Sequence, residues 1–548
     1  MADIVILNGR LMTMDGAEAE AMAIKRGMIE AVGATADIRG IAGTARVIDA
    51  GGATVLPGFI DSHVHLFAGS AELDYLNLTG VEGLDDLTAA VRRYSAGRPD
   101  DKVLFAASLD YDVIDGRAAT RHDLDKAMPD RPFAAMAADH HTVWANTRAL
   151  EAAGLLHGAP MPEGSEVVMA DDGTAHGELR ETGAFGPILA LTALGGRDLL
   201  GYVTGNDPVP PATATERALD KSVIANGMRH CASHGITGLH LMDGNFYQGE
   251  LLSEMDAEGT LLCRSEVPMH LKNTDPIDRL DEAAEMRRRF ATDMVWSGRV
   301  KMFMDGVIES RTAFMLEPYP GTDSCSEPLF QPDHFAEACK RIDAEGLQIS
   351  VHAIGDAAVR ATLDGYEAAR AANGPRDSRH RIEHIETIHP DDLGRIKPLG
   401  VVPSLQPLHS PAGGLFAPYE PDDLIRAAQI PYAFATRALR DTGAPVVFST
   451  DWPVVPVDVM PSVKAAVWRP ELPPEWPDQR STLHETLDSY TRLNAWVEFN
   501  EARKGRLRAG MMADVVVMDH DLEALDACDL DRARAAVTIC GGRITWEA

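Results

Sequence analysis

Eight short apolar segments, separated by longer stretches, limit what this chain of 548 residues can fold into. They predict strands at residues 54–66, 238–242, 262–271, 300–305, 348–352, 381–386, 401–406 and 445–451. Two intervening stretches, DHFAEACKRIDAEG and DAAVRATLDGYEAARAANG, have apolar residues at helical spacing and close with glycine. Strands alternating with crossover helices predict an α/β fold, and eight parallel strands can close a TIM-like (β/α)₈ barrel. An open doubly wound sheet is the alternative, but no Gly-rich phosphate turn follows the first strand.

The two ends of the chain resemble each other and differ from the middle. DIVILNGRLMTMD and AMAIKRGMIEAVG near the start, and ADVVVMDHD and AAVTICGGRITWEA at the end, have the pattern of short strands with Gly-containing turns. Each end alone would leave strand edges unpaired. We therefore expect a composite β-sandwich domain from residues 1–56 and 505–548, with the barrel in residues 57–70 and 217–504.

Residues 71–216 interrupt the alternation of strands and helices. This interval has strand-like segments of its own, VLFAASLD and PFAAMAADHHTVWA, followed by the helical NTRALEAAG. It is too long for a structureless loop. We expect an inserted subdomain that covers the C-terminal mouth of the barrel, with GNDPVPPATATE as the linker back.

Composition excludes several classes of partner. The chain has 51 Lys and Arg against 83 Asp and Glu, a formal charge of −32, which argues against nucleic acid and anionic membranes. No apolar run approaches the roughly 18 residues of a membrane span, and the N-terminus lacks the features of a signal peptide. The six cysteines form no C-x-x-C pair, so we expect reduced, buried thiols and a cytoplasmic protein that acts on a small molecule.

Histidines and a carboxylate lie at the ends of the predicted strands. His63 and His65, in VLPGFIDSHVHLFAGS, would point to the same side of an extended strand. His352, His384 and Asp451 end three other strands, and the C-terminal ends of barrel strands meet at one mouth. Imidazole and carboxylate suit a divalent ion such as Zn²⁺, whereas any single histidine is more often a hydrogen-bonded core residue than a ligand.

Lys301 lies on an apolar strand, where a charged amine is costly unless it is paired or neutralised. One interpretation is a salt bridge to Asp305 or Glu309. The other is that burial lowers the pKa of the amine. A neutral amine could add carbon dioxide, and the resulting carbamate could bridge two metal ions.

Four motifs, PGFIDSHVHL, HAIGDAAV, RIEHIE and FSTDWPV, resemble the amidohydrolase superfamily, and most closely the branch that contains N-substituted formamide deformylase. The resemblance covers nearly the whole chain, including GRLRAGMMADVVVMD. It implies that His63, His65 and Asp451 hold one metal ion, that His352 and His384 hold a second, and that a carboxylated Lys301 bridges them. A site with one ion remains an alternative, and a homodimer is a family expectation.

The resemblance also shows where this chain departs from the branch. Small residues are usual at the positions of Val307, Ile308 and Glu309, and glycine is usual at the position of His140. The next residue, His141, falls at a family pocket position. These departures imply a pocket of different shape and a different substrate.

The predicted activity is metal-dependent hydrolysis of a carbon–nitrogen bond in an amide or N-acyl compound. Two ions can share a hydroxide, lower the pKa of its parent water and polarise a carbonyl group. Asp451 is the predicted general base, which takes the proton of the water and passes it to the leaving amine. Alternatives are a heterocycle deaminase or an esterase on the same site, or a non-catalytic metal-binding scaffold.

Four side chains are candidates for substrate binding. Arg311 could clamp a substrate carboxylate, or could pair with Glu309 or Asp305 instead. His141 could donate a hydrogen bond to the scissile carbonyl, or could be satisfied within the insert. Trp452 could form an aromatic wall or simply pack, and Gln406 ends the seventh strand.

Overall fold

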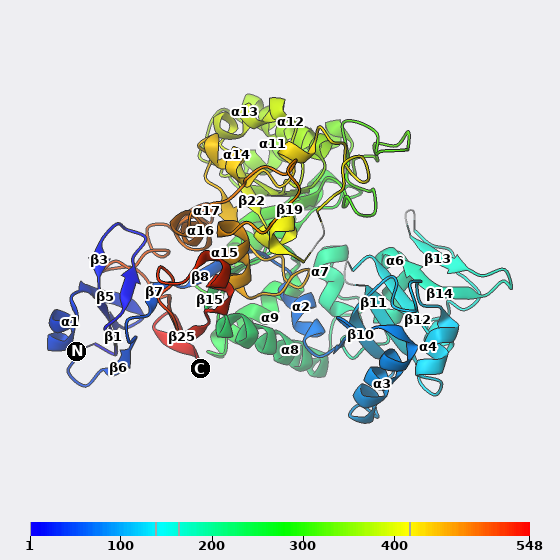
Figure 1. The fold of residues 1–548 in the computed structure, drawn as a ribbon, viewed down its shortest axis with the longest axis horizontal. Helices are drawn as coiled ribbons and strands as arrows, with labels where there is room; N and C mark the ends of the chain where they lie inside the picture. Colours follow the sequence, from blue (N-terminus) through cyan, green and yellow to red (C-terminus); the bar gives the residue numbers. More distant parts are fainter. Residues whose placement is uncertain (1, 138–139, 163–164, 416–417) are drawn as a thin grey trace. The chain divides into compact units, whose positions relative to one another are not determined.

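The structure is a computed structural model that describes residues 2–137, 140–162, 165–415 and 418–548. The chain forms two compact units, one of Met1–His65 with Met228–Ala548 and one of Leu66–Gly227. Figure 1 labels their helices and strands in chain order. Each unit has its own sheets and its own buried apolar core.

Two parallel sheets form the centre of the first unit. The strand order of the smaller is β18-β16-β15-β8, and that of the larger is β17-β19-β20-β21-β22-β23. Their bounds are β8 Phe59–Val64, β15 Ile236–Leu241, β16 Arg264–Glu266, β17 Met269–His270, β18 Val295–Trp296, β19 Arg299–Phe303, β20 Gln348–Ala353, β21 Arg381–His384, β22 Val402–Leu405 and β23 Val447–Phe448. A parallel bridge joins Trp452, which follows β23 of the larger sheet, to Val64 of β8 in the smaller sheet.

The strands expected from the sequence coincide with these elements, with two differences. The segment 54–66 is two strands, β7 (Thr54–Pro57) and β8, which belong to different sheets. They separate at Gly58, where a Cβ atom would lie 2.3 Å from the side chain of Thr237, so only glycine fits. The segment 262–271 is divided in the same way into β16 and β17.

Helices follow the parallel strands along the chain, as the alternation predicted. The two stretches with helical spacing are α11 (Pro332–Ala344) and α12 (Asp356–Asn373). α11 buries Phe335 and Ile342 on one face, and the ring of Phe335 lies against Gly365 of α12. The other helices of this kind are α9 Phe246–Ala257, α10 Asp281–Arg289, α13 Pro390–Leu399, α14 Thr436–Asp441, α15 Val459–Val467, α16 Leu483–Tyr490 and α17 Arg492–Val497.

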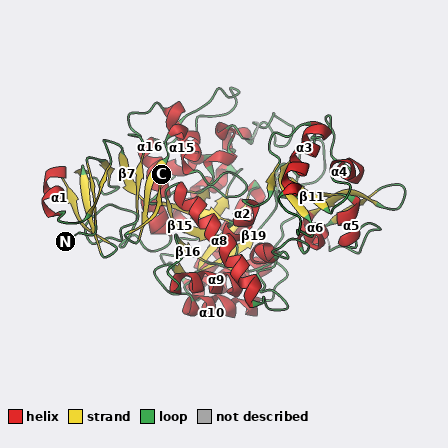
Figure 2. Ribbon diagram, turned by 90° about the horizontal axis from the view of Figure 1, so that it is seen from below, coloured by secondary structure: helices red, strands yellow, loops and turns green. Residues whose placement is uncertain are grey.

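Strands from both chain ends share one mixed sheet, as expected (Figure 2). Its order is β26-β25-β24-β7-β2-β3, with β24 antiparallel to β7 and β2 parallel to β7. A second sheet has the order β5-β4-β1-β6, and one apolar cluster joins the two. The pair is consistent with a β-sandwich. The bounds are β1 Ile4–Leu7, β2 Arg10–Met12, β3 Glu18–Ala19, β4 Ala21–Lys25, β5 Met28–Gly33, β6 Arg46–Asp49, β24 Val515–Met518, β25 Ala535–Cys540 and β26 Arg543–Glu547.

The second unit, Leu66–Gly227, is built on a mixed sheet of order β13-β14-β12-β11-β10-β9. The expected strand VLFAASLD is β10, and the expected helix NTRALEAAG is α5. The stretch PFAAMAADHHTVWA, expected as one strand-like segment, contains β11 and β12, and its residues 138–139 lie outside the described residues. The bounds are β9 Leu76–Asn77, β10 Leu104–Leu109, β11 Phe133–Ala137, β12 Thr142–Ala145, β13 Glu166–Met169, β14 Ala175–Arg180, α3 Gly83–Ala96, α4 Arg121–Ala127, α5 Thr147–Ala152 and α6 Glu181–Leu189. Apolar clusters lie on both faces of this sheet, so the unit has a core of its own.

Two expectations from composition can be compared with the structure. None of the described helices combines the length and the apolar character needed to cross a bilayer. All six cysteines are free, and Cys231, Cys263, Cys339 and Cys540 are buried as expected. The expectation was wrong for Cys528, which is exposed, and for Cys325, which is half-buried, because both lie in segments outside the strands and α-helices.

Candidate metal centre

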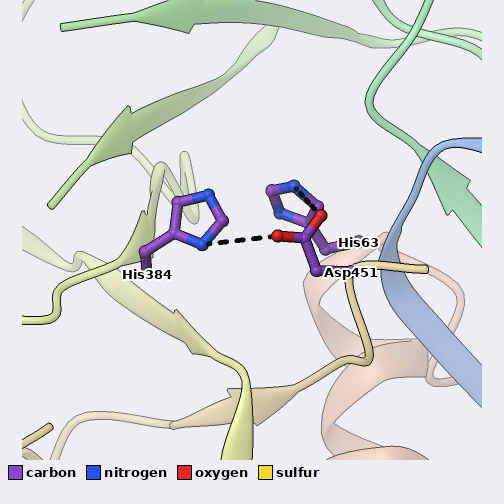
Figure 3. Close-up of side chains that lie close together, drawn as sticks. All are labelled: His63, His384 and Asp451. Atoms are coloured by element: carbon purple, nitrogen blue, oxygen red, sulfur yellow. Dashed lines mark ion pairs between the residues drawn. The ribbon is translucent and has the colours of Figure 1, made fainter. Parts of the chain in front are cut away.

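Three predicted ligands from distant parts of the sequence meet in the first unit (Figure 3). His63 belongs to β8, His384 is the last residue of β21, and Asp451 follows β23. The Nε2 atom of His63 lies 3.3 Å from Oδ1 of Asp451, and Nδ1 of His384 lies 3.9 Å from Oδ2. All three side chains are buried, and their ligand atoms lie within 4.8 Å of one another. The parallel register of the strands therefore brings two imidazoles and a carboxylate to one point.

The other two predicted histidines border the same cluster. Nε2 of His65 lies 3.3 Å from Oδ1 of Asp451, the same oxygen that faces His63. The ring centroid of His352, on β20, lies 4.5 Å from that of His384. The residue pairing of β20 and β21 explains this, because Ala353 lies opposite His384.

Each of three histidines has a partner at Nδ1. His63 donates from Nδ1 to Glu383 over 2.8 Å, and His384 donates to Oε1 of Gln406 over 2.9 Å. His65 donates from Nδ1 to Asp243. A histidine whose Nδ1–H is held in this way presents Nε2 as a lone-pair donor, which is the usual arrangement around a protein-bound metal ion. Gln406, predicted as a substrate contact, thus holds the ring of His384.

Two of these partners, Glu383 and Asp243, were not predicted as site residues. Glu383 directly precedes His384, and Asp243 follows β15 in HLMDG, so both stand where a parallel strand ends. A carboxylate at a strand end was the available signal. Their pairing with particular histidines depends on which strands are neighbours, and the sequence does not state that.

The backbone at this point is held in an uncommon conformation. His384 has φ of 75° and Asp451 has φ of 68°, both in the left-handed region that residues other than glycine rarely adopt. Such backbone strain persists only where the surrounding structure holds it, and it is concentrated at functional sites. Here it aims both side chains at the same point.

Unsatisfied polar atoms test whether these residues fit a metal ion. Oδ1 of Asp451 is buried and has no hydrogen-bond partner within the described part of the chain, although it lies close to two imidazoles. A buried, unpaired carboxylate oxygen is costly, and a cation removes that cost. Imidazole nitrogens with a carboxylate are the donor set that Zn²⁺ and similar ions prefer. The residues therefore fit a divalent ion.

The ionisation of the cluster suits metal ligation. Burial lowers the pKa of His63 to about 4 and that of His352 to about 3, so both are neutral ligands at pH 7. Burial alone would raise the pKa of Asp451, but the nearby histidines hold it well below its usual value. Burial also opposes protonation of His65, yet Asp243 and Asp451 raise its pKa to about 10. Metal binding at His65 therefore requires the loss of a proton.

Lys301 lies on β19, opposite Ser350 of β20, and is fully buried. Its Nζ atom has no hydrogen-bond partner among the residues that the structure describes, and it lies 4.6 Å from the ring centroid of Phe303. Neither carboxylate proposed as its salt-bridge partner is used in that way. Asp305 accepts backbone N–H groups, as from Gly355 over 2.8 Å, and Glu309 accepts from Tyr419 over 2.8 Å. Burial lowers the pKa of Lys301 to about 8.

The remaining predicted substrate contacts have different surroundings. Arg311 is exposed and, in the described residues, has neither of the ion pairs considered for it. Trp452 is buried, and its ring lies 5.8 Å from that of His230. His141 belongs to the second unit, where its Nδ1 atom lies 3.1 Å from Oε1 of Glu181.

A small cavity that the sequence did not predict adjoins His384. Its volume is about 20 Å³, and Glu386, Gln406, His409 and Phe434 contribute to its lining. Nε2 of His409 lies 3.7 Å from Oδ2 of Asp451, and Nδ1 lies 3.8 Å from Oε1 of Glu386. Burial raises the pKa of Glu386 to about 7. The signal available in the sequence was a further histidine soon after the seventh strand, in SLQPLHSP.

Known proteins resemble this chain over nearly its whole length. The model of the amidohydrolase family matches residues 46–546. The chain is 26% identical to N-substituted formamide deformylase of Arthrobacter pascens, over 100% of this chain and 99% of the relative. It is 27% identical to Protein LONG AFTER FAR-RED 3 of Arabidopsis thaliana, over 94% and 87% of the two chains. The solved structure of an uncharacterized metal-dependent hydrolase from Pyrococcus furiosus covers 94% of this chain and 98% of its own, with 26% identity and a TM-score of 0.70.

Proposed function

This chain belongs to the amidohydrolase family, and we propose that it is a metal-dependent enzyme that hydrolyses the carbon–nitrogen bond of an amide or N-acyl compound. The observation that carries the proposal is the meeting of His63, His65 and Asp451, in which one buried carboxylate oxygen lies 3.3 Å from two Nε2 atoms. The name of the formamide-cleaving relative supports the choice of bond.

The arrangement of these residues supports the following assignment of metal ligands. His63, His65 and Asp451 would bind one ion, and His352 and His384 would bind a second. Lys301, as a carbamate, would bridge the two. Zn²⁺ suits these donors best. When bound, the metal supplies Lewis acidity, which polarises the substrate carbonyl and makes a water molecule easier to deprotonate.

The chain's own residues account for the movement of the proton. Asp451 takes a proton from the attacking water as the oxygen of that water bonds to the carbonyl carbon. The same carboxyl group then gives the proton to the nitrogen as the carbon–nitrogen bond breaks, so the products are a carboxylic acid and an amine. Glu383, Asp243 and Gln406 keep the imidazoles in one orientation throughout, which avoids reorganisation during the reaction.

We further propose that the two parallel sheets are arcs of one closed (β/α)₈ barrel. The Val64–Trp452 bridge links the last strand to the first, and β16 and β17 lie only two residues apart along the chain. In such a barrel the functional residues follow the C-terminal ends of the strands. His65, Asp243 and Asp451 all follow a strand directly or within three residues.

A hydrolysis screen of the purified protein tests the proposed activity. Zn²⁺-supplemented protein would be offered N-formyl amines, N-acyl amino acids, lactams, heterocyclic amidines and esters. We expect release of an amine and a carboxylic acid in equal amounts from at least one amide. Release of ammonia from a heterocycle, or turnover of esters alone, would contradict the proposal, and so would no turnover of any amide with zinc present.

Carbon-13 NMR tests the state of Lys301 independently of activity. Protein equilibrated with ¹³C-bicarbonate should give a carbamate signal that is absent from Lys301→Met. A wild-type spectrum without that signal would exclude the bridging role of this lysine.

A further inference from the structure

The cavity beside His384 contains a buried carboxylate that the proposed metal site does not use. Glu386 is 7% exposed and lines this cavity. Its Oε1 atom faces His409, while Oε2 has no hydrogen-bond partner in the part of the chain that the structure describes. Leaving a buried acceptor without a partner is costly, and more so for a charged group. A carboxylate that lines a cavity and has one oxygen without a partner is therefore placed to accept a hydrogen bond from a ligand.

The orientation of His409 separates this carboxylate from the metal site. Nδ1 of the ring faces Glu386 and Nε2 faces Asp451, at 3.8 Å and 3.7 Å. Opposite edges of one imidazole thus contact the two acidic groups. A group bound at Glu386 would therefore be separated from Asp451 by the imidazole ring of His409. That position suits a substituent of the substrate rather than the bond that is hydrolysed.

One aromatic ring lines the cavity, and two further rings and a second carboxylate lie next to that ring. Phe434 lines the cavity, and its backbone N–H donates to the main-chain carbonyl of Glu386 over 2.7 Å. The ring centroids of Tyr419 and Trp476 lie 6.1 Å and 6.4 Å from that of Phe434. The hydroxyl of Tyr419 donates to Glu309 over 2.8 Å. Carboxylates next to aromatic faces are a favourable environment for an organic cation.

We propose that this pocket binds a protonated nitrogen of the substrate, with Glu386 as the counter-ion and Phe434 as the aromatic wall. The inference rests on the proposed function and narrows it, because the substrate is then an amide or N-acyl compound that carries a second, basic nitrogen. A volume of about 20 Å³ admits a group of the size of one water molecule, as an ammonium is. The carboxylate of Glu386 favours a cation at this position. The substrate carboxylate that Arg311 could have bound is therefore not expected here.

The competing explanation is that Glu386 only orients His409. That role needs Oε1 alone and gives Oε2 no function. It also predicts a different experimental result. A positioning residue affects all substrates alike, whereas a residue that binds the cation affects only substrates that carry the charge.

A matched pair of substrates separates the two explanations. N-formyl-1,4-diaminobutane and N-formylpentylamine differ only in an ammonium group that replaces a methyl group. We expect wild-type kcat/KM to be at least about tenfold higher for the charged amide, since a hydrogen bond to a charged group is worth that much. Glu386→Gln should bring the ratio close to one, mainly through KM. An unchanged ratio, or an equal loss with both substrates, would overturn the proposal.

Direct binding keeps the inference independent of hydrolysis. Calorimetry would compare butylammonium with 1-butanol on the wild type, Glu386→Gln, Phe434→Leu and the control Glu337→Gln, which changes an exposed residue of α11. We expect Kd for butylammonium to rise at least about tenfold in Glu386→Gln and about threefold in Phe434→Leu, and to stay unchanged in the control.

The two experiments distinguish failure of the pocket from failure of the activity. If the wild type binds butylammonium no better than butanol, the pocket is not a cation site, whatever amides the enzyme hydrolyses. If butylammonium binds through Glu386 but no amide is hydrolysed, the cation site stands and the proposed reaction is wrong. Phe434→Leu retains the carboxylate, so it reports on the pocket even if Glu386→Gln fails to fold.

Discussion

Two groups of histidines in this chain have the same chemistry but different surroundings. In the first unit, His63 and Asp451 have side-chain exposures of 1% and 6%. In the second unit, His141 and Glu181 have exposures of 29% and 43%, and the neighbouring His140 pairs with Glu72 over 2.9 Å. Histidine–carboxylate pairs therefore occur in both units, but only the first pair is withdrawn from solvent.

The surroundings of the rings explain why only the first group is a candidate ligand set. In the first unit the rings of His63 and His65 have separate partners at Nδ1, Glu383 and Asp243, and Nε2 of each ring faces the shared carboxylate of Asp451. In the insert the carboxylate of Glu181 itself contacts Nδ1 of His141. A metal site needs both the convergence and the supporting partner, and parallel strands supply both at their ends.

The largest expected effect separates the two groups by metal content. We expect His63→Ala and His384→Ala to lose nearly all bound metal, because each removes a ligand from a buried set. His140→Ala and His141→Ala should keep the wild-type content. Elemental analysis of the purified variants measures this. Equal loss in all four would remove the distinction between the two groups.

The next effect concerns turnover. Asp451→Asn should lower kcat by at least about 10²-fold, the usual contribution of a general acid–base group, while leaving the fold intact. The control is Asp364→Asn, which changes an exposed carboxylate of α12. Steady-state kinetics with a circular dichroism spectrum measures both aspects, and full turnover in the variant would exclude the role.

A smaller effect tests the partners of the ligands. We expect Glu383→Gln and Gln406→Ala to weaken metal affinity by about 10–100-fold, because they release the rings of His63 and His384. Glu181→Gln, which changes the partner of His141, should have no such effect. Titration in metal buffers gives the affinities. If Glu181→Gln weakened binding as much as Glu383→Gln, the supporting role would not be specific to the first unit.

The smallest effect is one that the two units should share. Thr482 and Glu485 form a capping box at the start of α16, and Thr120 and Asp123 form one at the start of α4. Either Thr→Ala substitution should cost about 1 kcal/mol of stability. Thermal unfolding measures the loss, and a much larger effect in one unit would show that the caps support more than their own helix.

The same capping boxes give a pH dependence with a defined sign. A hydrogen bond from Arg437 lowers the pKa of Glu485 to about 2, and one from Arg117 lowers the pKa of Asp123. A carboxyl with a lowered pKa in the folded state contributes its stability above the unfolded value, 4.5 for Glu485, and loses it as pH falls towards 2. Unfolding temperatures of Glu485→Gln and the wild type should therefore converge below pH 4.5; a constant difference down to pH 2 would contradict this.

Much of the fold was predictable because periodicity is a local property. The strand expected at 348–352 is observed as Gln348–Ala353, and α12 follows the apolar spacing of its sequence. The single strand expected at 54–66 was wrong, because β7 ends before Gly58, β8 begins after it, and the two strands belong to different sheets. The sheet to which a strand belongs depends on its neighbours, and its own residues do not reveal them.

The site shows the same limit. His63, His384 and Asp451 were predictable because each lies near the end of a strand, and strand ends can be found from the sequence. Glu383 and Asp243 were missed because their hydrogen bonds join different strands. The orphaned oxygen of Glu386 was also missed, since an unsatisfied atom is recognised only when every neighbour is in place.

The most direct test of the account is anomalous diffraction at the zinc absorption edge from crystals of the zinc-loaded protein. We expect a peak about 2.0–2.2 Å from Nε2 of His63 and from a carboxylate oxygen of Asp451, with His65 completing the set. A peak elsewhere, or no peak near these side chains at full zinc loading, would contradict the claim that the strand ends form a metal site.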